Sequence, residues 1–428
     1  MRRTTLVKLM APVLTLSLVA AACGGDDDTA DRTETTAARS GDGSTTAPAE
    51  TAPTETGAAT LRAELTDLLT EHVYLASLAS DAALRGDTAS FDAYAAALNG
   101  PTDSNSADIV AAVRSAYGDE VGEAFDGLWR SEDHIPAFVA YTQAAANNDQ
   151  AGKDAAVARL TSYAQTFGET MNSVNENLPA AVVTEAITTH ATTLLRVIDA
   201  QQAGDSPTAY QALRTAYHHM DMTAAALAGA TAKKLPDRFD GDADSAAAGL
   251  RAGLHSLLRE HVWLAASASD AAIGGRTAQF EAAAAALNGP SNSNSADVVA
   301  AIRSVYGDEV GTAFDGLWRS ENHIPAFVAY TEAVAAGDEA GKQQAVDELL
   351  AYAKTFGETM NSVNQNLPAS VVEDAIKDHA TTLLAVIDAQ KAGDPAKTAS
   401  SLREAVHHMS GTADALASAT AEQFPDKF

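Results

Sequence analysis

Apolar residues recur at spacings of three and four along nearly the whole chain after about residue 60. This spacing places them on one face of an α-helix, so it predicts amphipathic helices. The stretches 61–69 and 182–198 show it clearly, with apolar residues at Leu61, Leu65, Leu68 and Leu69 in the first. No stretch of the sequence shows the strict alternation that is typical of a strand. The pattern therefore predicts an all-α protein.

The helical pattern occurs twice. Residues 61–239 align with residues 250–428 without a gap, at an offset of 189 (261 − 72, from His72 and His261), and about two-thirds of the positions are identical. Each copy is large enough to form a core of its own. We therefore expect two tandem homologous helical-bundle domains, 61–239 and 250–428, of about six to seven helices each, joined by a short polar linker at 240–249.

A shorter repeat recurs three times inside each copy. In each unit a helix carries a histidine, then an acid or amide nine residues later, then a Gly or Asn, which is followed by Asp in five of the six units. Gly or Asn suits the left-handed residue that ends a helix, and Asp suits the cap of a returning helix, so each unit is expected to be a helical hairpin. The three histidines of a copy then lie at equivalent heights on three helices. The units begin at His72, His134 and His190 and, in the second copy, at His261, His323 and His379.

The N-terminus is typical of an export signal. Positive charges at Arg2, Arg3 and Lys8 precede an apolar run at 9–22 that is too short to span a bilayer comfortably. We therefore expect residues 1–22 to be a cleaved signal peptide.

The end of this signal, Val19-Ala20-Ala21-Ala22-Cys23, resembles the lipobox of bacterial lipoproteins, although Ala20 stands where the family usually has Leu. The resemblance implies that Cys23 is diacylated, becomes the new N-terminus and anchors the chain to the outer face of the cytoplasmic membrane. Cys23 is the only cysteine, so it has no disulfide partner. The alternative is a plain secretory cleavage site with a chance cysteine. Residues 23–60 have the composition of a flexible acidic linker.

The net charge of −29 makes nucleic acid an improbable partner, because such a surface repels phosphates. No later stretch is apolar and long enough for a second membrane crossing. The expected contacts are therefore the membrane, through the lipid on Cys23, and an unidentified envelope protein.

The histidines carry the candidate chemistry. Every histidine of the first copy has a counterpart in the second, and only His255 is unmatched. Their neighbours at helical spacing are apolar or small, so the rings should point inward, where a metal could satisfy their nitrogens. The alternative is that each ring bonds a backbone carbonyl or an Asp. The candidate metal ligands are His72, His134, His190, His218 and His219, with His261, His323, His379, His407 and His408 in the second copy.

Two methionines are candidate soft ligands that would favour copper over iron, Met220 beside His219 and Met409 beside His408. Glu71 is adjacent to His72 and points about 100° away on a helix, so it is a poor co-ligand. The site is thus expected to be rich in histidine and poor in carboxylate. Haem held by opposed histidines is a further possibility.

The stretch Glu132-x-His134-Ile135-Pro136 contains a proline close to a candidate ligand. We expect a kinked helix here, because proline inside a helix frees a carbonyl. The alternative is a break between two consecutive helices.

Helical hairpins with inward histidines resemble the hemerythrin-like and ferritin-like bundles, which implies a metal site enclosed by helices. The resemblance is architectural and carries over no catalytic residue. Ferritin-like sites need Glu-x-x-His on each of two helices, and Glu132-x-His134 has the wrong spacing; no histidine shared by the two copies has the His-x-x-x-Glu spacing of hemerythrin-like sites. Signatures of phosphate loops, zincins and serine hydrolases are also missing from the sequence, so we do not expect an enzyme. The sequence therefore predicts a membrane-anchored extracytoplasmic lipoprotein that binds a transition metal. A spacer or protein-interaction module with structural histidines is the alternative.

Overall fold

The computed structural model describes residues 51–428. Within this range the chain forms sixteen α-helices and no strand, as the apolar spacing predicted. The predicted signal peptide, Cys23 and most of the predicted acidic linker lie outside the described residues.

The sixteen helices divide into two matching sets of eight. The first repeat contains α1 (Gly57–Leu84), α2 (Thr88–Asn99), α3 (Asn105–Tyr117), α4 (Asp119–Trp129), α5 (Ile135–Ala146), α6 (Gln150–Val174), α7 (Ala180–Gln202) and α8 (Ser206–Lys234). The second contains α9 (Ala246–Ile273), α10 (Thr277–Asn288), α11 (Asn294–Tyr306), α12 (Asp308–Trp318), α13 (Ile324–Ala336), α14 (Glu339–Val363), α15 (Ala369–Ala392) and α16 (Pro395–Gln423).

Each repeat therefore has eight helices, where six or seven were expected. The difference comes from the region 88–146, which the structure divides into four helices of 11 to 13 residues. Gly118 separates two of them with φ 92° and ψ 171°, a backbone conformation that is open essentially to glycine alone. The apolar spacing continues across such short breaks, so it did not reveal them.

The segment around His134 is a break between helices and not the kink that we expected. α4 ends at Trp129, His134 caps the start of α5, and Pro136 lies in the first turn of α5. Proline is favourable there because the amides of the first turn have no partner inside the helix.

The three hairpin turns of the first repeat confirm the predicted helix signals. Gly86, Asn148 and Gly204 follow the ends of α1, α5 and α7 and have positive φ angles of 72°, 53° and 69°. The next residue in each case is an Asp whose carboxylate accepts a hydrogen bond from the first turn of the returning helix. In the second repeat Arg276 replaces the first of these aspartates and makes no side-chain cap bond.

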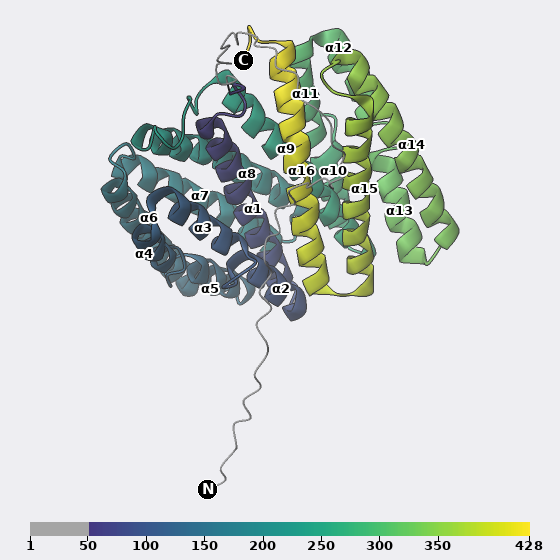
Figure 1. Ribbon diagram of the computed structural model, residues 1–428. Helices are drawn as coiled ribbons and strands as arrows, with labels where there is room; N and C mark the ends of the chain where they lie inside the picture. The colour runs from purple at the N-terminus through teal and green to yellow at the C-terminus, as the bar shows by residue number, and fades with distance from the viewer. Residues whose placement is uncertain (1–50) are drawn as a thin grey trace, which may run out of the picture. The chain divides into compact units, whose positions relative to one another are not determined.

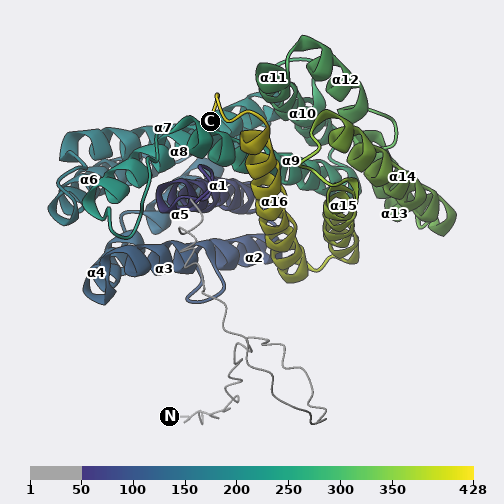
Figure 2. The ribbon, with the colours of Figure 1, turned by 45° about the horizontal axis from the view of Figure 1, so that its top comes forward.

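The two repeats pack against each other within one compact unit, Glu50–Phe428. α1 and α9 lie side by side at the junction, α2 contacts α16, and α8 contacts α10 (Figures 1 and 2). α1 and α9 begin at Gly57 and Ala246, a few residues inside the segments that were expected to be linkers.

Corresponding ion pairs cross this junction in both directions. Arg403 of α16 lies 2.6 Å from Glu71 and 2.6 Å from Asp108 of the first repeat. Arg214 of α8, at the equivalent position, lies 3.0 Å from Glu260 and 2.5 Å from Asp297 of the second. The repeats are thus related by a pseudo-twofold arrangement, in which each last helix neutralises a buried carboxylate of the other repeat.

No helix among the described residues is long and apolar enough to cross a membrane.

Candidate metal centre

Three histidines of the first repeat converge inside the bundle. His72 comes from the middle of α1, His134 from the start of α5 and His190 from the middle of α7. Each stands 14 residues before the Gly or Asn that follows its helix (86 − 72, 148 − 134 and 204 − 190), so they reach the same level of the bundle. One nitrogen from each ring can be chosen so that all three atoms lie within 4.8 Å of one another. This first triad could hold one metal ion.

The second repeat forms the same arrangement with His261, His323 and His379, whose chosen nitrogens also lie within 4.8 Å of one another. All six rings are buried, with exposed fractions between 1% and 4%. In both triads the groups close enough to share an ion are histidines alone. The predicted histidine-rich, carboxylate-poor site therefore agrees with the structure.

The rings meet at a common centre and do not form a linear stack. The ring centroids of His72 and His134 are 5.5 Å apart, and those of His72 and His190 are 5.6 Å apart. In the second triad the corresponding separations are 5.4 Å and 5.6 Å. The two sites thus have nearly the same geometry in spite of the differences between the repeats.

The surrounding residues fix the orientation of His134. Its Nδ1 lies 2.7 Å from the carbonyl oxygen of Trp129, the last residue of α4, and its ring stacks on Tyr163 at 4.5 Å with an interplanar angle of 3°. A carbonyl can only accept, so Nδ1 donates the proton and Nε2 keeps its lone pair. This is the usual way in which a protein prepares an imidazole as a metal ligand. The second triad repeats it, with 2.6 Å between His323 Nδ1 and the Trp318 carbonyl oxygen.

Several nitrogens of the triads have no hydrogen-bond partner among residues 51–428. Nδ1 of His72, His190 and His261 is buried without a hydrogen bond, as are both ring nitrogens of His379. A buried polar atom without a partner costs free energy, and such atoms are uncommon in folded proteins. An ion or a ligand at the triads would supply partners for ring nitrogens of this kind.

The electrostatics keep the imidazoles neutral. Burial lowers the pKa of His134 to about 4. Burial, together with the neighbouring His134 and His219, lowers the pKa of His190 to about 3. Burial and the other two rings of its triad also hold the pKa of His72 well below its ordinary value. Neutral imidazole is the form that binds metals, so near pH 7 each triad presents three uncharged nitrogen donors.

The structure does not bring His218 or His407 to the triads, which corrects our prediction. His218 forms ion pairs with Asp221 and Glu260 at the repeat junction, and His407 Nε2 lies 2.6 Å from Glu71. The reason is helical geometry, since adjacent residues on a helix point about 100° apart. A pair of adjacent histidines therefore cannot both face the same site.

His219 and His408 lie beside the triads but bind elsewhere. His219 Nε2 lies 2.9 Å from the Ala186 carbonyl oxygen, and His408 Nε2 lies 3.1 Å from that of Ala375. Met220 is a buried core residue, and Met409 lies in the wall of a cavity next to the second triad. Both methionines are almost fully buried, 3% and 2% exposed, and core packing accounts for each of them.

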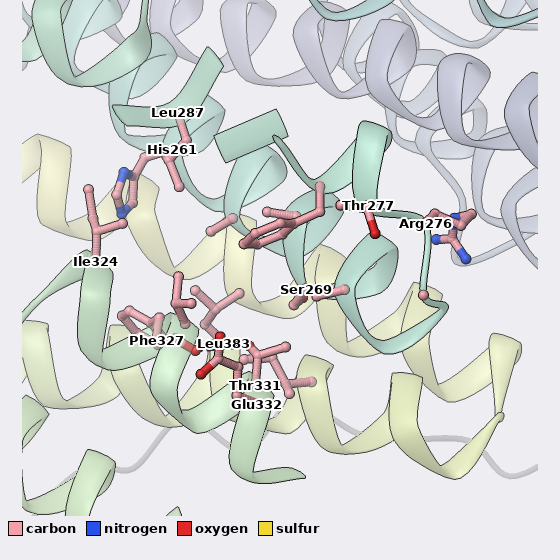
Figure 3. Close-up of a pocket in the computed structure, with 17 residues that line it drawn as sticks. His261, Ser269, Arg276, Thr277, Leu287, Ile324, Phe327, Thr331, Glu332 and Leu383 are labelled. Carbon is pink, nitrogen blue, oxygen red and sulfur yellow. Dashed lines mark hydrogen bonds between the residues drawn. The ribbon is translucent and has the colours of Figure 1, made fainter. Parts of the chain in front are cut away.

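Two cavities border the second triad. One, of about 410 Å³, is lined by His261, His323 and His379 together. The other, of about 260 Å³, reaches only His261, which lies at one end between Leu287 and Ile324, with Arg276 at the opposite end (Figure 3). A small molecule in the larger cavity could therefore reach a coordination position that the three histidines of the second triad leave open.

The residue that orients His134 was not among the predicted site residues. The backbone carbonyl of Trp129 sets the tautomer of His134, and the Trp129 indole donates to Ser106 Oγ at 2.9 Å. A signal was present, because the five-residue separation of Trp129 and His134 is identical in both copies. His255, which has no counterpart in the first copy, lies far along α9 from the triad, between Asp67 and Asp414.

Comparison with family models, curated proteins and solved structures finds no match for this chain. The class of the protein is therefore defined by its own features, as an all-α protein of two packed repeats, each with a buried histidine triad that could hold a metal ion.

Proposed function

We propose that the chain is a membrane-anchored extracytoplasmic lipoprotein that binds one transition-metal ion in each repeat. The observation that carries the proposal is the pair of triads, in which three buried histidines offer nitrogens within 4.8 Å of one another. Both repeats have the same three histidines and the same backbone carbonyl that fixes the tautomer of one of them, although about a third of positions differ between the repeats.

The donor set narrows the choice of ion. Imidazole nitrogen suits copper, iron, zinc and nickel, whereas magnesium and calcium require oxygen ligands that the triads lack. Copper heads the order of affinities among divalent first-row ions, so we propose copper first. Iron is the second candidate because it too binds imidazole nitrogen, although it stands low in that order.

A bare ion fits the triad better than haem does. In haem the four pyrrole nitrogens surround the iron, and histidines can approach only from the two faces of the macrocycle. A third imidazole nitrogen within 4.8 Å of the other two would occupy space that the macrocycle needs. A purely structural role of the histidines is less favourable too. Structural histidines normally have hydrogen-bond partners for their nitrogens, and five ring nitrogens of the triads have none in the part of the chain that the structure describes.

The metal half of the proposal is tested on the untagged full-length protein. Purified protein is stripped with a chelator, incubated with copper or iron, desalted, and measured by inductively coupled plasma mass spectrometry. We expect about two ions per chain. Protein that retains neither metal would overturn the proposal.

The anchor half is tested separately with Cys23→Ala. The unchanged chain is expected in the membrane fraction and to be released by detergent, whereas the variant is expected in the soluble extracytoplasmic fraction, because it has no acylated cysteine. An unchanged membrane association of the variant would contradict the lipid anchor and leave the metal sites unaffected.

A further inference from the structure

The cavity that touches all three histidines of the second triad has the size of a small-molecule site. Its volume of about 410 Å³ falls within the usual range for ligand pockets. Its walls are mostly apolar and include Leu258, Trp318, Phe356 and Leu416. The cavity in Figure 3 reaches one histidine only, so it is a less suitable site for a ligand of the whole triad.

The polar residues that line the larger cavity include histidines and carboxylates. His379 lies in its wall, is 3% exposed, and neither of its ring nitrogens has a hydrogen-bond partner among the described residues. The exposed residues Asp374 and Asp378 also line it, and no lysine or arginine does. The carboxylates repel anions, and the apolar walls do not solvate a cation, so an uncharged ligand is favoured.

Aromatic walls favour a flat ligand. Trp318 is 5% exposed, stacks on Phe314 and lies 4.9 Å from the His261 ring, centroid to centroid. Phe356 contributes a second aromatic face to the cavity. Aromatic side chains of this kind pack well against planar rings.

We infer that this cavity binds an uncharged nitrogen heterocycle with an apolar substituent. The substituent occupies the apolar part, and the ring nitrogen points to the triad. Three histidines leave at least one coordination position of an ion open, and the heterocycle donates its lone pair there. This coordinate bond rests on the proposed metal site. Binding of the apolar substituent does not rest on the metal site. In the metal-free protein the ring nitrogen of the heterocycle hydrogen-bonds to His379 instead, and the substituent still occupies the apolar part of the cavity.

Two alanines in its wall make the cavity testable. Ala375 of α15 is half-buried and Ala415 of α16 is exposed, and both line the cavity. A leucine at each position adds apolar volume to the wall. Gly411 also lines the cavity, but the first repeat carries Met222 at the equivalent position with 67% of its surface exposed, so a larger side chain there would lie in solvent.

The experiment uses the full-length protein, both metal-free and copper-loaded, and isothermal titration calorimetry with two probes. The probes are 4-phenylimidazole and imidazole, at a pH where both are mostly uncharged. We expect 4-phenylimidazole to bind about tenfold more tightly than imidazole, because its phenyl group is removed from water. It should also bind the metal-free protein, more weakly.

A filled cavity provides the decisive comparison. In the variant Ala375→Leu with Ala415→Leu, the preference for 4-phenylimidazole at one site per chain is expected to disappear, while imidazole binding stays the same. The matched control is Ser400→Leu with Glu404→Leu, at exposed positions of α16 that do not line the cavity, and it should keep the preference.

The results separate the two proposals. Equal affinity for the two probes, or a preference that survives the filled cavity, overturns the ligand site even if the protein holds two copper ions. Conversely, a protein that retains no metal but still prefers 4-phenylimidazole, and loses that preference in the filled variant, supports the cavity and refutes the metal sites.

Discussion

His134 Nδ1 donates to the backbone carbonyl oxygen of Trp129 at 2.7 Å, and this bond leaves Nε2 free for a ligand inside the bundle. Because the acceptor belongs to the backbone at the end of α4, the short loop between α4 and α5 sets the tautomer. The loop thus has a chemical role as well as a connecting one.

Substitution of this histidine should remove one site and spare the other. With His134→Ala, we expect the metal content to fall from about two ions per chain to about one, because two imidazoles hold an ion much less firmly than three. His323→Ala should do the same, and the double variant should retain no metal. Metal content by mass spectrometry measures this directly.

The matched control is His219→Gln, whose amide can still donate to the Ala186 carbonyl. It should keep both ions. Loss of an ion from this variant with full retention by His134→Ala would show that the ligand set is wrong.

Metal binding should also raise the stability of the fold. The triads join α1, α5 and α7 or their counterparts, which separate on unfolding. At a free-ion concentration one hundredfold above Kd, each site is expected to add about 2.7 kcal/mol to the free energy of unfolding. Urea denaturation with and without copper measures the gain. The double variant His134→Ala, His323→Ala should show none, and an equal gain there would mean that the metal binds elsewhere.

The carboxylate beside the first triad is expected to matter for stability and not for metal. Glu71 is fully buried and lies 3.0 Å from Arg259, 2.6 Å from Arg403 and 2.6 Å from His407, all of the second repeat. Glu71→Gln removes the carboxylate that pairs with His407 and leaves Arg259 and Arg403 with one carboxylate each, Asp67 and Asp108. The free energy of unfolding should therefore fall by about 3 kcal/mol.

Urea denaturation tests this loss, and the metal content of the folded variant should remain about two. The matched variant Glu260→Gln should lose less stability, because Glu260 has two cationic partners, Arg214 and His218, where Glu71 has three. The position equivalent to Arg259 is Thr70 in the first repeat. A Glu71→Gln protein that is stable but binds one ion fewer would make Glu71 a ligand and contradict the structure.

The repeat junction should lose stability at alkaline pH through His218. Burial by itself would lower the pKa of His218, but its hydrogen bonds and charge interactions with Asp221 and Glu260 outweigh burial and raise the pKa to about 10. Arg214 of the same helix, itself paired to Glu260 and to Asp297 of α11, faces the ring as well. A raised pKa in the folded state stabilises the fold fully below the ordinary pKa of 6.5, and this stabilisation is lost as the pH rises through about 10.

The free energy of unfolding is therefore expected to fall between about pH 6.5 and pH 10, and His218→Gln should reduce that slope. Urea denaturation at several pH values gives both curves. An identical slope in the variant would show that His218 is not the responsible group.

The sequence could predict the helices and the triads because both depend on local, repeated signals. The equal separation between each histidine and its Gly or Asn placed His72, His134 and His190 at one level. The sequence could not predict ion pairs such as Glu71 with Arg403, because these depend on how the two repeats pack against each other. The sequence could have predicted that His218 and His219 do not both face the triad, since adjacent residues on a helix point in different directions. For Trp129 the sequence offered the repeated five-residue separation from His134 and nothing more, because the hydrogen bond of its carbonyl depends on the path of the loop between α4 and α5.

The central claim is that three imidazoles in each repeat bind one transition-metal ion, and X-ray absorption spectroscopy at the copper edge tests it most directly. The copper-loaded, untagged protein should show multiple scattering from about three imidazole rings per ion, at a metal–nitrogen distance of about 2.0–2.1 Å. A spectrum with only oxygen neighbours, or with fewer than two imidazoles per ion, would contradict the claim.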